Sequence, residues 1–157
     1  MSQRRSRLHW SEASAVIVLD TNVVSELMRP SPAPAVEAWM AGRDAADLFF
    51  TAVGEAELRY GVTVMAPGRR RSAVESSVEA MLREDFAGRI LPFDSAAARA
   101  YAVIAATRRA AARPITQADG QIAAIARSRS MAVATRNTRD FESVGVDLID
   151  PWDAGDD

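Results

Sequence analysis

The chain has 157 residues, 48% of them hydrophobic, which suits one domain with a substantial core. It has no cysteine and a single histidine, His9, which excludes disulfides and thiolate chemistry and argues against histidine-centred triads and multi-histidine metal sites. All 19 basic residues are arginine, which excludes lysine-dependent phosphate loops and Schiff bases, and the net charge of -2 gives no general attraction for nucleic acid.

The N-terminal residues are basic and polar. We expect residues 1–14 to form a flexible basic arm, residues 15–153 to form a single domain, and residues 154–157 to be a short acidic tail. The apolar run after the arm is too short for a secretory signal, and no stretch approaches transmembrane length. We therefore expect a soluble, cytoplasmic protein that does not interact with membranes.

The first predicted element is a strand over Ala15 to Leu19, whose uninterrupted apolar run is typical of strands buried inside parallel sheets. The polar triplet Asp20-Thr21-Asn22 follows directly, and apolar residues then resume at helical spacing. A carboxylate therefore stands at the carboxyl end of a central strand, where α/β proteins bind ligands. The alternative is that Asp20 only caps the helix that follows.

The strand-then-helix pattern then repeats. The helix after Asp20 is expected to end near Met28, ahead of a proline-rich segment, and a second helix should run from Pro34 to about Gly42. Residues 48–50 predict another short buried strand, which leads at Thr51 into a third helix.

The helix after Thr51 carries a charge within an apolar pattern. Val53, Tyr60 and Val64 form a predicted apolar stripe, and Glu57 lies between the first two at helical spacing. Burial of an unpaired carboxylate is costly, so we expect a cation to meet Glu57 there. The alternative is a glutamate at the rim of the core that pairs with an arginine.

A further helix, a strand and a long helix follow. Residues 69–86 predict a helix whose three leading arginines are interpreted as a solvated helix start, with a binding patch as the alternative. Residues 88–93 predict a strand, and Pro92 favours an edge position in the sheet. Asp94 is the expected cap of an alanine-rich helix that reaches about Ala112.

The next helix starts within residues 115–119, and Ile122 lies on its buried face. Asp119 precedes Ile122 by three residues, so it should point toward the same interior as Glu57. Thr116 and Asp119 also have the spacing of a capping box, which leaves a structural role for Asp119 as the alternative.

The last two predicted strands cover residues 131–134 and 147–152, and the first of them ends in the polar segment 135–141. Strands that alternate with helices predict an α/β fold with a parallel sheet covered on both faces. Right-handed crossovers bring all the strand ends to one edge, where the acidic residues can converge. Clustered carboxylates without lysine or histidine favour Mg²⁺ or Mn²⁺, and such a site hydrolyses phosphodiesters.

Five segments in this order resemble the PIN-domain ribonuclease toxins of the VapC and FitB type: VLDTNVVSE, AELRYG, FAGRILPFD, ADGQIAAIA, and ATRNTRDF followed by DPW. The likeness extends from about Val16 to Trp152. It implies a three-layer α/β/α sandwich with a mostly parallel five-stranded sheet, forming one nuclease domain. It also implies a metal-dependent endoribonuclease, a homodimer, and neutralisation by a small antitoxin, with a dimer of dimers as a further assembly.

The resemblance assigns Asp20, Glu57 and Asp119 to the metal-binding acids of the family. The fourth acid falls at Asn137, where many relatives have aspartate, and an amide can ligate a metal but adds no negative charge. Asp140, three residues further on, is the alternative fourth ligand. The remaining expected site residues are Asn22 and Thr135, which orient ligands or water by hydrogen bonds, and Arg136 and Arg139, which contact RNA phosphates.

The resulting hypothesis is a toxin that holds one Mg²⁺ or Mn²⁺ and uses an activated water to cut RNA. A second hypothesis is a weakly active or inactive binding module that works through its antitoxin on promoter DNA, and Asn137 is the residue that favours it. A third is a DNA-directed nuclease with the same site chemistry. RNA as the substrate follows from the family resemblance alone.

Overall fold

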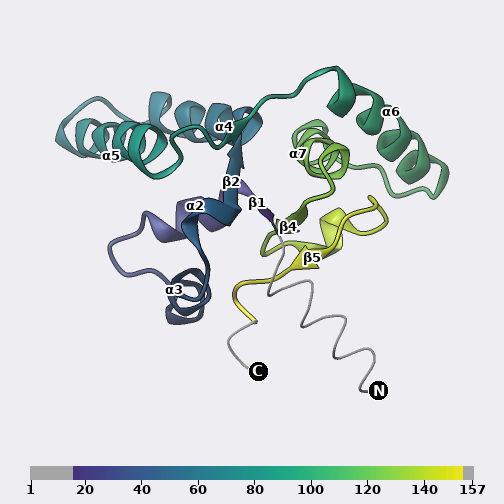
Figure 1. Ribbon diagram of the computed structural model, residues 1–157. Helices are drawn as coiled ribbons and strands as arrows, with labels where there is room; N and C mark the ends of the chain where they lie inside the picture. The colour runs from purple at the N-terminus through teal and green to yellow at the C-terminus, as the bar shows by residue number, and fades with distance from the viewer. Residues whose placement is uncertain (1–15, 154–157) are drawn as a thin grey trace.

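The computed structural model describes residues 16–153, shown as the coloured ribbon in Figure 1. The expected basic arm and acidic tail, residues 1–14 and 154–157, lie outside the described residues. Five short strands form one parallel sheet with helices on both faces. The predicted α/β fold with three layers is therefore confirmed.

The sheet places the first strand at its centre. The strand order is β3-β2-β1-β4-β5, and every neighbouring pair is parallel. The strands are β1 (Ile17–Leu19), β2 (Leu48–Thr51), β3 (Ile90–Leu91), β4 (Ala132–Ala134) and β5 (Leu148–Ile149). The strand that precedes Pro92, β3, lies at an edge, as its proline predicts.

The helices follow the strands in the expected order. They are α2 (Thr21–Leu27), α3 (Pro34–Ala41), α4 (Ala52–Thr63), α5 (Arg69–Ala80), α6 (Ser95–Ala110) and α7 (Gln117–Ser128). A π-helical turn, η2 (Met81–Asp85), extends α5, and two 3₁₀ turns, η1 (Ala45–Asp47) and η3 (Thr138–Phe141), lie in connections. Within residues 16–153 no helix is both long enough and apolar enough to cross a bilayer.

Side-chain caps explain where several helices begin. A side-chain oxygen of the residue before the helix accepts a hydrogen bond from a backbone N–H of the first turn, which would otherwise lack a partner. These caps are Asp20 for α2, Thr51 for α4, Asp94 for α6 and Thr116 for α7. The predicted capping role of Asp94 is thus confirmed.

Alternate residues of β1 face two separate parts of the core. Ile17 and Leu19 pack with apolar residues of α2, α3 and α5 on one face of the sheet. Val18 packs with α6 and α7 on the other face. Figure 1 shows these two helical layers, with α2 and α3 on one side of the strands and α6 and α7 on the other.

The predicted apolar stripe on α4 is found at Val53, which is partly buried against the core, and is wrong for Tyr60 and Val64. Tyr60 is 70% exposed and Val64 is 62% exposed, so neither belongs to the core. The helix instead buries Gly54 and Val62. A Cβ atom on Gly54 would lie 2.4 Å from the buried Phe50 ring, so the close approach of α4 to β2 depends on a residue without a side chain. A glycine contact leaves no apolar signal in the sequence. The sequence pattern therefore indicated the wrong face of α4 as the buried one.

The order of the strands explains why a site forms after β1. The chain passes from β1 to β2 and β3 on one side, then crosses over to β4 and β5 on the other. Such a reversal leaves a crevice at the carboxyl ends of the strands. The Asp20 N–H donates to the Ala134 carbonyl at 2.9 Å, so Asp20 lies where β1 and β4 end together.

Candidate active site

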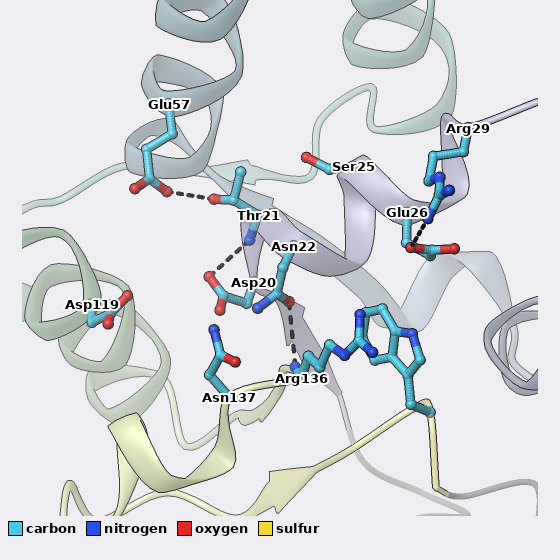
Figure 2. Close-up of a pocket in the computed structure, with 11 residues that line it drawn as sticks. Asp20, Thr21, Asn22, Ser25, Glu26, Arg29, Glu57, Asp119, Arg136 and Asn137 are labelled. Atoms are coloured by element: carbon cyan, nitrogen blue, oxygen red, sulfur yellow. Dashed lines mark hydrogen bonds and ion pairs between the residues drawn. The ribbon is translucent and has the colours of Figure 1, made fainter. Parts of the chain in front are cut away.

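A pocket of about 580 Å³ opens at the carboxyl end of β1. Figure 2 shows that its labelled side chains come from α2 and the residues on either side of it, from α4, from α7 and from the segment after β4. Trp152, in the segment after β5, also lines the pocket. The lining residues are Asp20, Thr21, Asn22, Ser25, Glu26, Arg29, Glu57, Asp119, Arg136, Asn137 and Trp152. The structure thus places all four residues expected to be catalytic, Asp20, Glu57, Asp119 and Asn137, in the lining of one pocket.

Asp20 is fixed by two hydrogen bonds at the base of this pocket. Its side chain is buried, and Oδ1 accepts from the Thr21 backbone N–H at 2.8 Å. Oδ2 accepts from the Thr135 hydroxyl, also at 2.8 Å. Asp20 therefore does cap α2, as the structural alternative proposes, but it also lines the pocket with both oxygens held in place.

Thr135 and Asn22 connect the ends of β1 and β4. The buried Thr135 hydroxyl accepts from the Asn137 backbone N–H at 3.0 Å and from the Asn22 amide at 3.4 Å. The Asn22 carbonyl oxygen accepts from the Arg136 backbone N–H at 3.4 Å. These bonds orient the Asp20 carboxylate, although Asp20 and Thr135 are 115 residues apart in the chain.

Glu57 extends from the exposed face of α4 and accepts a hydrogen bond from the Thr21 hydroxyl at 2.5 Å. Within residues 16–153 it forms no ion pair with an arginine. Glu55, two residues earlier, pairs with Arg59 at 2.8 Å instead. Neither the expected buried position of Glu57 nor its alternative arginine pairing is therefore found.

Asp119 lies half-buried in the first turn of α7, where its backbone N–H donates to the Thr116 hydroxyl at 3.2 Å. The next residue, Gly120, lets α7 pack closely on α6, since a Cβ atom there would lie 2.8 Å from the Tyr101 ring. The capping alternative is thus correct for Thr116, while the Asp119 carboxylate faces the pocket together with Asp20 and Glu57.

Burial raises the pKa of the two less exposed acids. The pKa of Asp20 is raised from 3.8 to about 6, mainly by burial, with the charges of Asp119 and Glu57 adding to it and the hydrogen bonds from Thr135 and Thr21 opposing it. Burial is also the largest cause of the raised pKa of Asp119, and the charges of Asp140 and Glu57 contribute. The acids are therefore close enough to disfavour one another's ionisation.

The loop after β4 carries the remaining expected site residues. Asn137 lines the pocket, and in Figure 2 its amide points toward Asp20. Asp140 and Arg139 are exposed in η3 and do not line this pocket. Arg136 lines it with its guanidinium group 4.9 Å above the centre of the Trp152 ring.

Buried Arg108 holds this loop in place. Its guanidinium group donates to the carbonyl oxygens of Asp140 at 2.9 Å and Glu142 at 3.1 Å, and to that of Arg113 at 2.6 Å. The arginine therefore joins the end of α6 to the segment that carries Asn137. Its positive charge also lowers the pKa of Asp119, against the effect of burial.

The sequence interpretation missed the other side of the pocket, which Glu26, Arg29 and Trp152 help to form. Glu26 is 7% exposed, and its carboxylate accepts from the Ala33 N–H at 2.7 Å and from Arg29 at 3.3 Å. The Ala33 hydrogen bond is the main reason that the pKa of Glu26 is lowered. Glu26 and Arg29 follow Asn22 by four and seven residues, a spacing that could have revealed them. Trp152 gives no comparable local signal.

The acidic side of the pocket suits a hard divalent cation by its chemistry. Among residues 16–153, no three acidic or histidine side chains lie close enough to form a metal site as they stand. The donors are nevertheless carboxylate and amide oxygens, which Mg²⁺ and Mn²⁺ favour. Within the same residues, no salt bridge neutralises Asp20, Glu57 or Asp119. The donor set therefore fits such an ion.

A parallel sheet of this order, with acids around the end of its central strand, is the arrangement expected of a PIN domain. The PIN domain family matches residues 17–147, and the chain therefore belongs to this family. It is 43% identical to the VapC ribonuclease Y4jK of Sinorhizobium fredii over 138 residues, which cover 88% of this chain and 99% of the relative. It is 40% identical to toxin FitB of Neisseria gonorrhoeae over 137 residues, 87% of this chain and 99% of FitB.

A solved structure of FitAB bound to a DNA fragment, IR36, is also similar. The two folds superpose with a TM-score of 0.81 at 40% identity, over 87% of this chain and 95% of the other. These comparisons confirm the resemblance to PIN-domain toxins of the VapC and FitB type.

Proposed function

We propose that this protein is a metal-dependent endoribonuclease that acts in the cytoplasm as the toxin of a toxin–antitoxin pair. The observation that carries the proposal is the meeting of Asp20, Glu57 and Asp119, from three separate elements, in one pocket without a neutralising salt bridge in the described part of the chain. The identity with a VapC ribonuclease supports RNA as the substrate.

In this proposal Asp20, Glu57 and Asp119 hold Mg²⁺ or Mn²⁺, with Asn137 or Asp140 as a further oxygen ligand. A bound ion of this kind supplies an activated water and stabilises the negative charge that builds on the phosphate. Thr135 keeps the Asp20 carboxylate aimed into the pocket through its hydrogen bond. The Thr21 hydroxyl occupies one Glu57 oxygen, so Glu57 must share or release that bond to serve as a ligand. Arg136 and Arg139 contact RNA phosphates.

The partner in this proposal is a small antitoxin. The similar FitAB was solved bound to a DNA fragment, which supports a complex of toxin and antitoxin that binds DNA. In this proposal the antitoxin makes the DNA contacts. The toxin itself would form a homodimer, and two such dimers would join in the complex with the antitoxin.

The decisive experiment compares cleavage of single-stranded RNA and DNA with Mg²⁺, Mn²⁺ or EDTA. We expect metal-dependent cleavage of RNA, and we expect Asp20→Asn to reduce it by at least about 100-fold, because the substitution removes an anionic metal ligand. The matched control is Asp147→Asn, an exposed acid outside the pocket, purified in the same way to exclude contaminating ribonuclease. Full metal-dependent activity in Asp20→Asn would show that the assignment is wrong.

The second candidate is a weakly active or inactive module that works through its antitoxin on promoter DNA. Asn137 favours it, because this pocket residue provides an amide without negative charge. Absence of cleavage under every metal condition, together with DNA binding by the antitoxin complex, would support this candidate. Cleavage of DNA in preference to RNA would instead identify a DNA-directed nuclease.

A further inference from the structure

The pocket has a second side whose chemistry differs from that of the acids. Arg29 and Arg136 lie across the pocket from Glu57 and Asp119, as Figure 2 shows. Trp152 also lines the pocket, and the Arg136 guanidinium group lies over its ring. We call Arg29, Arg136 and Trp152 the arginine–tryptophan shelf. One pocket therefore combines carboxylates that suit a cation with arginines that suit an anion. A phosphodiester chain lying across the pocket would meet both.

Arg136 is positioned for a ligand and has donors to offer. Its backbone is fixed at the end of β4 by the hydrogen bond to Asn22, and its guanidinium group lies over the Trp152 ring at 4.9 Å. Within residues 16–153, no hydrogen bond or salt bridge uses the Arg136 guanidinium group. A guanidinium group that lies over an indole ring and makes no hydrogen bond keeps its N–H groups for other acceptors, such as phosphate oxygens.

Trp152 is held rigidly enough to act as a platform. Its side chain is half-buried and packs against the core cluster that contains Ile17 and Leu19, and its backbone N–H donates to the Asp150 carboxylate at 2.9 Å. Aromatic rings and guanidinium planes are the surfaces on which proteins stack unpaired bases. The Trp152 and Arg136 pair therefore offers a flat surface beside a phosphate-binding group.

The shelf keeps an excess of positive charge. Glu26 is the nearby carboxylate, but one of its oxygens accepts from the Ala33 N–H and the other from Arg29. The Arg29 side chain remains 65% exposed, so it is accessible to a ligand. On this side of the pocket, two arginines thus face one lining carboxylate, Glu26, whose oxygens already accept hydrogen bonds.

We propose that the arginine–tryptophan shelf binds a nucleotide next to the scissile phosphate of a single-stranded RNA. Arg136 and Arg29 contact the phosphate, and the base stacks on the surface formed by Trp152 and the Arg136 guanidinium group. Bases in a duplex are stacked on their own neighbours, so only an unpaired strand can use this surface. The position next to the cut rests on the proposed function, whereas binding at the shelf does not require cleavage.

The test measures binding in a protein that cannot cut. Fluorescence anisotropy in Mg²⁺ gives the Kd of Asp20→Asn for a labelled, unstructured RNA of about ten nucleotides, a length within the range of single-strand sites. Arg136→Gln added to this background is expected to raise the Kd at least about fivefold, since it removes both the phosphate contact and part of the stack. Arg83→Gln, an exposed arginine outside the pocket, is the matched control and should leave the Kd within about twofold.

Two further arms separate stacking from charge. The same RNA in a duplex, and a strand with abasic sites, should each bind at least about fivefold more weakly than the single strand. Quenching of tryptophan fluorescence by RNA should disappear in Trp152→Phe. The midpoint of thermal unfolding of this variant shows whether it is folded. Equal binding of duplex and single strand, or an Arg136→Gln variant that binds like Arg83→Gln, would overturn the shelf. Because no arm measures cleavage, these results are independent of whether the protein is a nuclease.

Discussion

Asp20 is a buried carboxyl group whose charge is costly in the free protein. Its pKa is raised from 3.8 to about 6, so the folded state binds the proton more tightly than the unfolded state does. The free energy of unfolding should therefore fall as the pH rises from about 4 to about 6, and the loss is complete above the folded pKa. The buried Asp20 carboxylate thus lowers the free energy of unfolding at neutral pH, and in its charged form it can bind a cation.

We expect Asp20→Asn to be more stable than the wild type at pH 7 in EDTA, by roughly 1–3 kcal/mol. The amide keeps the shape of the side chain and removes the buried charge. At pH 4 the difference should nearly vanish, because the wild-type carboxyl group is then protonated in the folded state. Urea unfolding across this pH range is the measurement, with Asp147→Asn as the control. A variant that is less stable at both pH values would contradict the prediction.

The sequence located the acids of the site better than the rest of its lining. Asp20 follows a buried strand, and Asp119 lies in the first turn of a capped helix, so each had a local signal. The neutral pocket residue Asn137 also follows a buried strand. Trp152 reaches the pocket only through the packing of distant segments, whereas Arg29 directly follows the helix that carries Asn22. Glu26 lies at helical spacing from Asn22, but its burial depends on the backbone N–H of Ala33, a partner that a side-chain pattern does not reveal. The assignment of metal and catalytic roles remains a prediction.

At the scale of elements, α4 depends on a glycine contact. Gly54→Ala would place a Cβ atom 2.4 Å from the buried Phe50 ring, and neither the ring nor the helix can move without disturbing the core. We expect a loss of roughly 1–3 kcal/mol of unfolding free energy, and a lower activity because Glu57 moves with the helix.

Gly61→Ala, on the same helix, is the matched control for this prediction. A Cβ atom added at Gly61 would have no atom from another part of the protein within 4 Å. It should raise the unfolding free energy by about 0.5–1 kcal/mol through helix propensity alone. Denaturant unfolding of both variants separates the two effects. Equal effects of the two substitutions would mean that the contact with Phe50 does not restrict α4.

The elements themselves were largely predictable, since uninterrupted apolar runs, capping residues and prolines mark their ends. The face that each helix buries was less predictable from the sequence. The pattern of Val53, Tyr60 and Val64 suggested a core stripe on α4, but Gly54 sets the contact instead. A buried arginine was equally invisible, because a charged side chain is expected at the surface unless its partners are known. The partners of Arg108 are carbonyl oxygens of two other loops.

At the scale of the whole molecule, the exposed apolar residues Tyr60 and Val64 of α4 indicate a contact surface. Tyr60 and Val64 lie four residues apart near the end of α4, and both are largely exposed in the monomer. Large apolar side chains on one helical face typically mark a surface that another protein covers. The proposed homodimer provides such a partner.

We expect the double substitution Tyr60→Ser and Val64→Ser to shift the protein from dimer to monomer in sedimentation velocity at micromolar concentration, because it removes the apolar contact. Ala73→Ser, on the exposed surface of α5, serves as the control. If the double variant sediments like the wild type, this face is not the dimer contact. If the wild type is itself monomeric, the homodimer is wrong.

The hydrogen bond between Thr135 and Asp20 joins residues that are 115 positions apart. A ribosome needs on the order of 10 s to travel that distance. During this interval the nascent chain contains Asp20, the first acid of the site, but lacks β4. The strand β4 pairs with β1 and completes the base of the pocket. Chains released early should therefore be harmless to the cell that makes them. Only a nearly finished polypeptide can assemble the pocket, so any partner that restrains it has the whole period of synthesis in which to arrive.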